Sequence, residues 1–366
     1  MFDTTILRNS GVTMTLRVIQ WATGTVGKHA IAAVHDHPDL ELVGVYVYSE
    51  AKAGLDAGDI AGIAPLGVLA TRDIEEILAI DADCVLYMPQ GEMNPPGAVE
   101  DICRLLASGK NVISTAVTSL IYPLSLGQDV VDQLEQACAQ GSTSFHATGI
   151  EPGWAAEILP LTISPLLSRT ESILVQELMD YSTYDSRDMV FDIMGFGKHP
   201  DEPVIMAEPA MAKVVFSAPL MLLADGLGAT IDDYVFHREV AVAPEAFDTK
   251  VGRIEAGTVS AQRFSLTAIV EGRPALTVEH ITRMRADQAP DWPEGRGWRV
   301  TIEGTPSMTM DAVISTNGED EVDQGCLGTA MHAVHAIPPV CAATPGIRTF
   351  LDLPLITGRH ILRAAR

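Results

Sequence analysis

Residues 17–34 read RVIQWATGTVGKHAIAAV, and the fold follows from this stretch. The run from Arg17 to Trp21 has the length and composition of a buried β-strand. It stops at a turn of small residues, and Gly24 to Val34 then has the pattern of a helix that ends at His37-Pro38. A short buried strand that leads directly into a helix is typical of a parallel sheet with crossover helices, so the sequence predicts an α/β fold.

The turn between this strand and helix reads Ala22-Thr23-Gly24-Thr25-Val26-Gly27, an A-x-G-x-x-G pattern. The first small residue permits a tight turn, Gly24 lets the backbone approach a diphosphate, and Gly27 lets the helix lie close to the strand. The free N–H groups that open the helix would hold the diphosphate of a dinucleotide. We therefore predict cofactor contacts at Thr23, Gly24, Thr25, Val26 and Gly27. The alternative is an ordinary glycine-containing turn.

Strands and helices alternate through the first 149 residues. Beyond the first strand, further strands are predicted at 41–48, 68–70, 83–88, 111–115 and 143–148, and further helices at 95–108 and 128–140. The pattern predicts a doubly wound parallel Rossmann sheet of six strands, which forms a dinucleotide-binding domain over residues 1–149.

The pattern changes after Pro152. Strands are predicted at 172–179, 234–242, 264–271, 276–283 and 298–303, with one strong helix at 211–227. This arrangement is typical of an antiparallel sheet flanked by helices, so residues 150–325 are predicted to form an α+β domain that binds the substrate. A helical pattern returns at 325–337, and residues 326–366 are expected to pack back on the first domain.

Composition narrows the class of ligand. The chain has 366 residues, and 48 acidic side chains against 24 basic ones give a net charge of −24, which argues against nucleic acid or an anionic membrane as a partner and favours a small molecule. The five cysteines are widely spaced without a C-x-x-C pair, so neither a disulfide framework nor a metal site is expected. The first residues lack the pattern of a signal peptide and no apolar run has the length of a membrane span, which predicts a cytoplasmic protein.

The end of the second strand bears on the choice of cofactor. NAD enzymes commonly carry an acidic residue there that binds the ribose hydroxyls, whereas this chain reads Tyr48-Ser49-Glu50-Ala51-Lys52. Ser49 at the tip and Lys52 within reach of a 2′-phosphate favour NADP(H). Glu50 leaves NAD open, and a solvated Lys52 is the alternative. Six further residues lie at or just after the ends of the fourth and fifth strands, at the same edge, and are predicted to contact the cofactor: Met88, Pro89, Gln90, Ser114, Thr115 and Ala116.

Several motifs together resemble a known family. They are the A-x-G-x-x-G turn, Val112-Ile113-Ser114-Thr115 with Tyr122-Pro123, Gly149-Ile150-Glu151-Pro152-Gly153-Trp154 with Leu159-Pro160, Leu223-Ala224-Asp225-Gly226-Leu227-Gly228, and Ala336-Ile337-Pro338-Pro339-Val340 with Pro345-Gly346. In combination they resemble the dihydrodipicolinate-reductase-like superfamily, in the branch of 2,4-diaminopentanoate dehydrogenase and the native amine dehydrogenases. The resemblance implies hydride transfer between a nicotinamide and a carbon bonded to nitrogen. It also implies a homodimer, for which the second domain would supply the interface.

The resemblance fails at one functional position. The amine dehydrogenases carry an acidic residue shortly after the serine and threonine pair of the fifth strand, whereas residues 114–119 read STAVTS. Two carboxylates are candidate replacements as acid or base: Glu151 at the domain junction and Glu92 in the loop after the fourth strand. For each, a solvated loop residue is the alternative.

The predicted function is hydride transfer to or from a C=N or C=O carbon of a small, largely apolar substrate, with Tyr122, Trp154 and Tyr184 as candidate pocket walls. His332 and His335 lack a third ligand, which argues against a metal. Two alternatives stay open, namely a carbonyl or imine reductase that uses no ammonia and a non-catalytic NADP-binding regulator.

Overall fold

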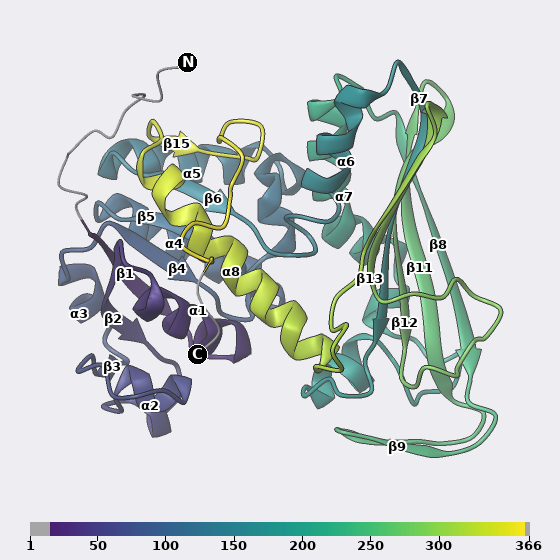
Figure 1. Ribbon diagram of the computed structural model, residues 1–366, viewed down its shortest axis with the longest axis horizontal. Helices are drawn as coiled ribbons and strands as arrows, with labels where there is room; N and C mark the ends of the chain where they lie inside the picture. The colour runs from purple at the N-terminus through teal and green to yellow at the C-terminus, as the bar shows by residue number, and fades with distance from the viewer. Residues whose placement is uncertain (1–14, 363–366) are drawn as a thin grey trace, which may run out of the picture.

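The computed structural model describes residues 15–362, and these form two domains, each built on one large β-sheet (Figure 1). The sequence-based expectation about a signal peptide concerns residues that lie largely outside this range. The first domain is a parallel sheet covered by helices, and the second is a broad sheet with helices on the face toward the first domain. The predicted fold class, a Rossmann domain followed by an α+β domain, is confirmed.

The first sheet has the strand order β15-β6-β5-β4-β1-β2-β3, with every neighbouring pair parallel. Its strands are β1 (Leu16–Trp21), β2 (Leu40–Tyr46), β3 (Ala70–Thr71), β4 (Cys84–Tyr87), β5 (Asn111–Ser114), β6 (Ser144–Ala147) and β15 (Gly346–Ile347). Its helices are α1 (Thr25–Asp36), α2 (Ala57–Ala61), α3 (Ile74–Ala79), α4 (Pro95–Ala107) and α5 (Gln128–Gly141). The seventh strand, β15, was not predicted, because two residues are too short to produce a periodic pattern.

The direction of winding reverses between β1 and β4, at the centre of this sheet. Ligands of doubly wound sheets bind in the crevice at the carboxyl ends of the strands, at this switch point. The turn after β1 and the loop after β4 therefore meet where a dinucleotide is expected.

The second sheet has the order β14-β13-β7-β12-β11-β8. Its strands are β7 (Arg169–Asp180), β8 (Asp233–Val242), β11 (Val259–Val270), β12 (Arg273–Arg283), β13 (Gly297–Thr305) and β14 (Met308–Ala312). The sheet is mixed rather than purely antiparallel, because β7 and β12 pair in parallel. The long crossover between them, which contains helix α7 (Pro209–Gly226), makes that pairing possible. A short hairpin of β9 (Phe247–Thr249) and β10 (Gly252–Ile254) extends from this sheet as an arm.

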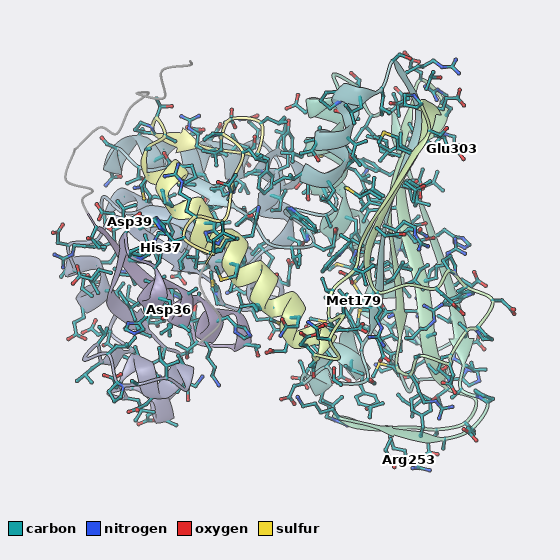
Figure 2. All side chains as sticks on the ribbon, viewed as in Figure 1. Asp36, His37, Asp39, Met179, Arg253 and Glu303 are labelled. Carbon is teal, nitrogen blue, oxygen red and sulfur yellow. The ribbon has the colours of Figure 1, made fainter. Side chains whose placement is uncertain are left out.

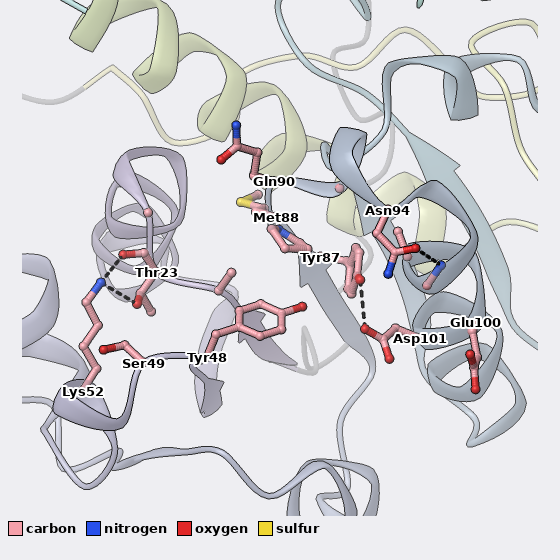
Figure 3. Close-up of a pocket in the computed structure, with 16 residues that line it drawn as sticks. Thr23, Tyr48, Ser49, Lys52, Tyr87, Met88, Gln90, Asn94, Glu100 and Asp101 are labelled. Atoms are coloured by element: carbon pink, nitrogen blue, oxygen red, sulfur yellow. Dashed lines mark hydrogen bonds between the residues drawn. The ribbon is translucent and has the colours of Figure 1, made fainter. Parts of the chain in front are cut away.

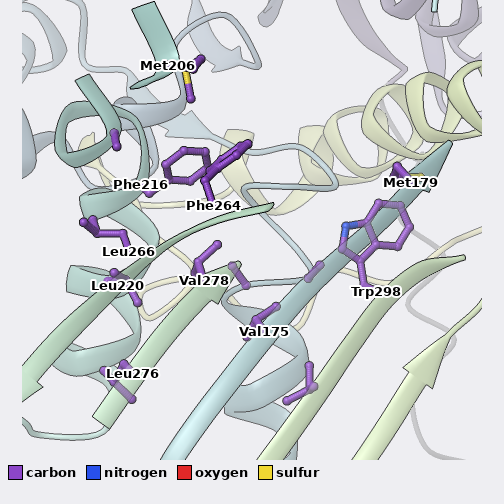
Figure 4. Packing of buried hydrophobic residues seen from close by; sticks show 14 of the residues in the cluster. Val175, Met179, Met206, Phe216, Leu220, Phe264, Leu266, Leu276, Val278 and Trp298 are labelled. Atoms are coloured by element: carbon purple, nitrogen blue, oxygen red, sulfur yellow. The ribbon is translucent and has the colours of Figure 1, made fainter. Parts of the chain in front are cut away.

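Helix α7 packs on the inner face of the second sheet, where Phe216 and Leu220 meet Phe264, Leu266 and Val278 (Figure 4). Contrary to the expectation from sequence, α7 is long and apolar enough to cross a membrane by length and composition alone. Half of its span is buried within the protein, and a core helix of a soluble protein passes the same test. Its place in the hydrophobic core accounts for its apolar composition.

Helix α8 (Glu321–Cys341) joins the two domains. It begins beside the second sheet, where the Thr183 hydroxyl donates to Asp320, and it then packs along α1 of the first domain. Figure 2 shows Met179 of β7 close to the start of this helix. The helix is longer than the predicted 325–337 because it continues through Pro338 and Pro339. Its first turns therefore form one wall of the space between the domains.

Candidate active site

The turn after β1 has the geometry of a diphosphate site. Ala22 adopts φ +73°, and its conformation is held by a hydrogen bond from its N–H to Tyr46 O (2.9 Å) and by the Gln20 amide, which donates to Ala22 O (2.9 Å). A Cβ on Gly27 would lie 2.3 Å from Ala22 O, so only glycine permits this approach of α1 to the strand. The tight packing assigned to Gly27 is therefore present.

The N-terminus of α1 is open toward a ligand. Gly24 is the N-cap, no side chain of the described residues caps the helix, and a Cβ built on Gly24 would meet nothing within 4 Å. The first-turn N–H groups thus face a space that protein atoms leave clear, and the positive end of the helix dipole favours an anion there. These features fit the diphosphate of a nicotinamide dinucleotide.

A cavity of about 680 Å³ lies on one side of this turn (Figure 3). Tyr48, Ser49 and Lys52 line it from the segment after β2, and Met88, Pro89 and Gln90 line it from the loop after β4. Two tyrosine hydroxyls are fixed in its wall, since Trp21 Nε1 donates to Tyr48 Oη (2.9 Å) and Tyr87 Oη donates to Asp101 (3.1 Å). Aromatic surface with fixed polar groups suits the adenosine half of a dinucleotide.

Lys52 is not a freely solvated lysine. Its Nζ donates to Thr23 O (2.8 Å) and to Thr23 Oγ1 (3.1 Å), which ties the segment after β2 to the diphosphate turn. Burial lowers the pKa of Lys52, and the positive charge of Lys28 lowers it further. Lys52 therefore lies in the cavity wall beside the diphosphate turn, close enough to Lys28 to feel its charge.

A second cavity of about 620 Å³ lies on the other side of the turn, between the domains. It shares Gly24, Met88, Pro89 and Gln90 with the first cavity, so the two spaces flank one diphosphate turn. Six more residues of the first domain line this second cavity: Thr25, Val26, Glu92, Thr115, Ala116 and Thr118. The second domain and α8 contribute Thr183, Tyr184, Asp185, Ser186, Met189, Lys250, Asp320, Val322, Asp323, Cys326 and Thr329. Its position beside the diphosphate turn suits the nicotinamide end of a dinucleotide and a substrate.

Glu92 places a carboxylate in this second cavity. It belongs to a short 3-10 turn (Gly91–Met93), and its Oε1 accepts a hydrogen bond of 2.5 Å from the backbone N–H of Thr118. Thr118 follows Ser114-Thr115, in the segment where the resemblance places the acid that this sequence lacks. A carboxylate from the neighbouring loop therefore lies beside the segment that carries no acid of its own.

Three predicted site residues line neither cavity. Gly27 lies beneath the turn, and Ser114 Oγ accepts a hydrogen bond from Ala116 N (3.1 Å), which shapes the end of β5. Glu151 is buried behind the cavity with its side chain 2% exposed, and its Oε1 lies 4.0 Å from His280 Nε2. It therefore lines neither cavity, and it is buried rather than the solvated loop residue given as the alternative.

Three other residues that the sequence suggested as possible site residues, Tyr122, Trp154 and His332, line neither cavity. The Tyr122 hydroxyl donates to Asp225, the Trp154 ring packs on Trp298, and His332 bonds Thr148 Oγ1 (2.6 Å). Figure 2 shows His37 and Asp39 together at the far end of α1. Within residues 15–362, no group of three His, Cys, Asp or Glu side chains has an arrangement that would hold a metal ion.

Several residues that line the second cavity were not predicted from the sequence, because they lie in segments for which no site was expected. Lys250, at the tip of the β9–β10 arm, reaches the cavity and forms an ion pair with Asp185 (3.3 Å). Asp320 caps α8 by accepting from the N–H groups of Val322 and Asp323. An acidic N-cap before a helical pattern is a signal that sequence can provide, whereas the position of the arm has no local signature.

Comparisons with known proteins agree with this architecture. Residues 18–114 match the N-terminal part of dihydrodipicolinate reductase, and residues 156–363 match the C-terminal domain of 2,4-diaminopentanoate dehydrogenase. An amine dehydrogenase of Streptomyces virginiae is 36% identical over 351 residues, which cover 93% of this chain and 96% of the relative. The 2,4-diaminopentanoate dehydrogenase of Acetoanaerobium sticklandii is 23% identical over 67% of each chain.

Solved structures show the same fold. An amine dehydrogenase from Mycobacterium smegmatis superimposes with a TM-score of 0.77 at 19% identity, covering 94% of this chain and 97% of the other. Biliverdin reductase from Synechocystis gives a TM-score of 0.53 at 12% identity, with 91% and 93% covered. Fold, motifs and sequence identity agree, and the chain is an oxidoreductase that belongs to the family of amine dehydrogenase and 2,4-diaminopentanoate dehydrogenase.

Proposed function

We propose that this protein is an NADP(H)-dependent amine dehydrogenase that transfers hydride to or from a C=N or C=O carbon of a small, largely apolar substrate. The observation that carries the proposal is the Glu92 carboxylate, held by Thr118 N inside a cavity that begins at the diphosphate turn. The amine dehydrogenases in the family comparison support the same chemistry.

Each part of the site has a distinct task in this mechanism. When bound, the cofactor supplies or accepts the hydride, which carries two electrons. The N–H groups at the start of α1 hold the diphosphate, and the loops after β4 and β5 confine the reacting end. Glu92 takes one proton from the substrate nitrogen as the amine is oxidised and returns one in the reverse reaction. Water then cleaves the C=N bond and releases ammonia, and the cavity walls limit the access of other water.

The absence of an acid in residues 114–119 favours a second candidate, a carbonyl or imine reductase that uses no ammonia. A panel of small ketones, assayed with NADPH in the presence and absence of ammonium, separates the two. We expect NADPH to be consumed only when ammonium is present, with an amine as the product. If NADPH is consumed equally fast without ammonium and the product is an alcohol, the protein is the carbonyl reductase instead. Tight NADPH binding without any turnover would instead favour the regulator.

The preference for NADP(H) is tested at Lys52. We expect Lys52→Ala to weaken the binding of NADPH by about 10-fold to 100-fold, because a charge-assisted hydrogen bond to phosphate contributes about 1.5–3 kcal/mol. The binding of NADH, which lacks the 2′-phosphate, should change little. Calorimetric titration with both cofactors checks this, with Glu50→Gln as the control in the same segment. An equal loss of affinity for NADPH and NADH would show that Lys52 acts only through its hydrogen bonds to Thr23.

We also propose a homodimer joined through the second-domain sheet. The face opposite α7 combines an ion pair of the half-buried Arg263 with the buried Glu279 (2.6 Å) and an exposed Val235 on the outer strand β8. A sheet face of this kind is suited to packing against a second copy. Light scattering of the purified protein should give twice the mass of the chain, and a monomer mass at all concentrations would contradict the proposal.

A further inference from the structure

The wall of the first cavity that α4 forms carries a carboxylate with an unused acceptor. Asp101 Oδ2 accepts a hydrogen bond from Tyr87 Oη (3.1 Å), and within residues 15–362 no group donates to Asp101 Oδ1. The side chain is half-buried. Burial raises the pKa of this carboxyl, against the opposing effects of Tyr87 and Arg104. A carboxylate that has lost part of its water is stabilised by a ligand that brings an N–H group to the free oxygen.

Rigid elements hold this carboxylate in place. Tyr87 is the last residue of β4 and is 2% exposed, and its hydroxyl orients Asp101. Helix α4 begins at a side-chain cap, because Asn94 Oδ1 accepts a hydrogen bond from Gly97 N (3.2 Å). Asp101 lies on the second turn of that helix. A binding group that is fixed by a strand and a helix, rather than by a loop, loses little freedom when a ligand binds.

The two ends of the first cavity differ in charge. Lys52 lies at one end, and the neighbouring carboxylates of Glu100 and Asp101 lie at the other (Figure 3). The acidic end repels the diphosphate and a 2′-phosphate, whereas Lys52 attracts both. A dinucleotide therefore binds with only its neutral base toward α4.

Between these ends, Tyr48 offers a surface for a flat base. Its side chain is 51% exposed, and its hydroxyl accepts a hydrogen bond from Trp21 Nε1 (2.9 Å). Stacking on an aromatic ring binds any base and does not distinguish one from another. The choice between bases therefore depends on polar groups that meet the edge of the base. Of the two carboxylates at this end, Glu100 is exposed to solvent, whereas Asp101 has lost part of its water.

We propose that Asp101 selects the adenine base of the cofactor, with Oδ1 accepting a hydrogen bond from the 6-amino group of adenine while the base lies against Tyr48. Tyr87 acts as a positioning residue, because its hydroxyl holds Oδ2 and leaves Oδ1 for the ligand. A base with a carbonyl oxygen in place of the amino group would set lone pairs against the lone pairs of the carboxylate. The inference rests on the proposed function and concerns the end of the dinucleotide that is remote from the reaction.

The preference for adenine is tested by binding alone. Deamino-NADPH contains hypoxanthine, with a carbonyl oxygen in place of the 6-amino group, and is otherwise the same molecule as NADPH. Calorimetric titration of the unaltered protein should give a Kd about 10-fold to 100-fold higher for deamino-NADPH, the effect expected when a hydrogen bond to a charged group is lost. Equal Kd values for the two cofactors would overturn the proposal.

Asp101→Asn tests the assignment to this residue. An asparagine amide has both an acceptor and a donor, so it can bond the amino group of adenine or the carbonyl oxygen of hypoxanthine, and the two Kd values should come within about twofold of each other. Glu100→Gln is the matched control, because Glu100 lines the same wall but is exposed, and it should keep the full ratio. A full ratio in Asp101→Asn, or its loss in Glu100→Gln, would overturn the assignment.

Tyr87→Phe tests the positioning role. Phenylalanine keeps the ring, whose centroid lies 5.6 Å from that of Trp21, and lacks only the hydroxyl. Asp101 can then turn toward solvent, so the ratio of the two Kd values should fall by at least about threefold, the effect of a weak hydrogen bond. A general loss of stability would weaken the binding of both cofactors equally and leave the ratio as it is. An unchanged ratio would therefore overturn the role of Tyr87.

The outcomes separate this inference from the function on which it rests. If the unaltered protein binds neither NADPH nor deamino-NADPH, the proposed function itself fails. If it binds both equally and still consumes NADPH with a ketone and ammonium, the proposed function stands and the selection of adenine by Asp101 is wrong.

Discussion

Replacement of Gly24 by valine should weaken the binding of NADPH by at least about 100-fold, or about 2.7 kcal/mol, while the protein stays folded. Gly24 has φ −71° and ψ −169°, a conformation that any residue adopts, and its Cβ would meet no protein atom within 4 Å. The new side chain instead occupies the space through which a diphosphate reaches the first N–H groups of α1. Calorimetric titration with NADPH measures the loss.

The control for this variant is Gly27→Ala. Its Cβ would lie 2.3 Å from Ala22 O, so this variant should lose both stability and cofactor binding because α1 can no longer pack on β1. Gly24→Val should keep its stability within about 1 kcal/mol, the range of N-cap substitutions. If Gly24→Val binds NADPH as the original protein does, the diphosphate does not lie at this turn.

Replacement of Glu92 by glutamine should lower kcat by about 100-fold to 10,000-fold, because general acid and base groups contribute rate factors of this order. Glutamine keeps an oxygen that can accept from Thr118 N, so the loop should keep its position while the proton-accepting charge is lost. The Kd of NADPH should change little. Steady-state rates in both directions, with amine and with ketone plus ammonium, measure the effect.

Asp185→Asn is the control for Glu92→Gln. Asp185 lines the same cavity, but its carboxylate is paired with Lys250 and is exposed, so its loss should change KM more than kcat. A Glu92→Gln variant with full activity at every pH would show that another group manages the proton at this wall.

Local patterns were sufficient to predict much of the site. The A-x-G-x-x-G turn, the segment from Tyr48 to Lys52, and the ends of β4 and β5 all line the two cavities or support them, because parallel strands deliver their carboxyl ends to one edge. The sequence did not predict how deeply Glu151 is buried, since its sequence neighbours indicate a turn but not the burial of the side chain. The contact between Glu92 and Thr118 joins residues 26 positions apart, and no local pattern specifies such a pair.

The alternation of strands and helices in the first domain and the glycines of the turn could be predicted from sequence alone, since periodicity and the steric needs of a close approach act over a few neighbouring residues. The family resemblance could also be recognised from the sequence motifs. Only the tertiary structure decided which carboxylate meets the substrate space and which is buried. Glu92 lies in the cavity because the loops after β4 and β5 are neighbours at the sheet edge, whereas Glu151 is buried near His280 of β12 and Glu177 of β7. Burial depends on contacts between distant segments, and burial sets the proton affinity of a carboxylate.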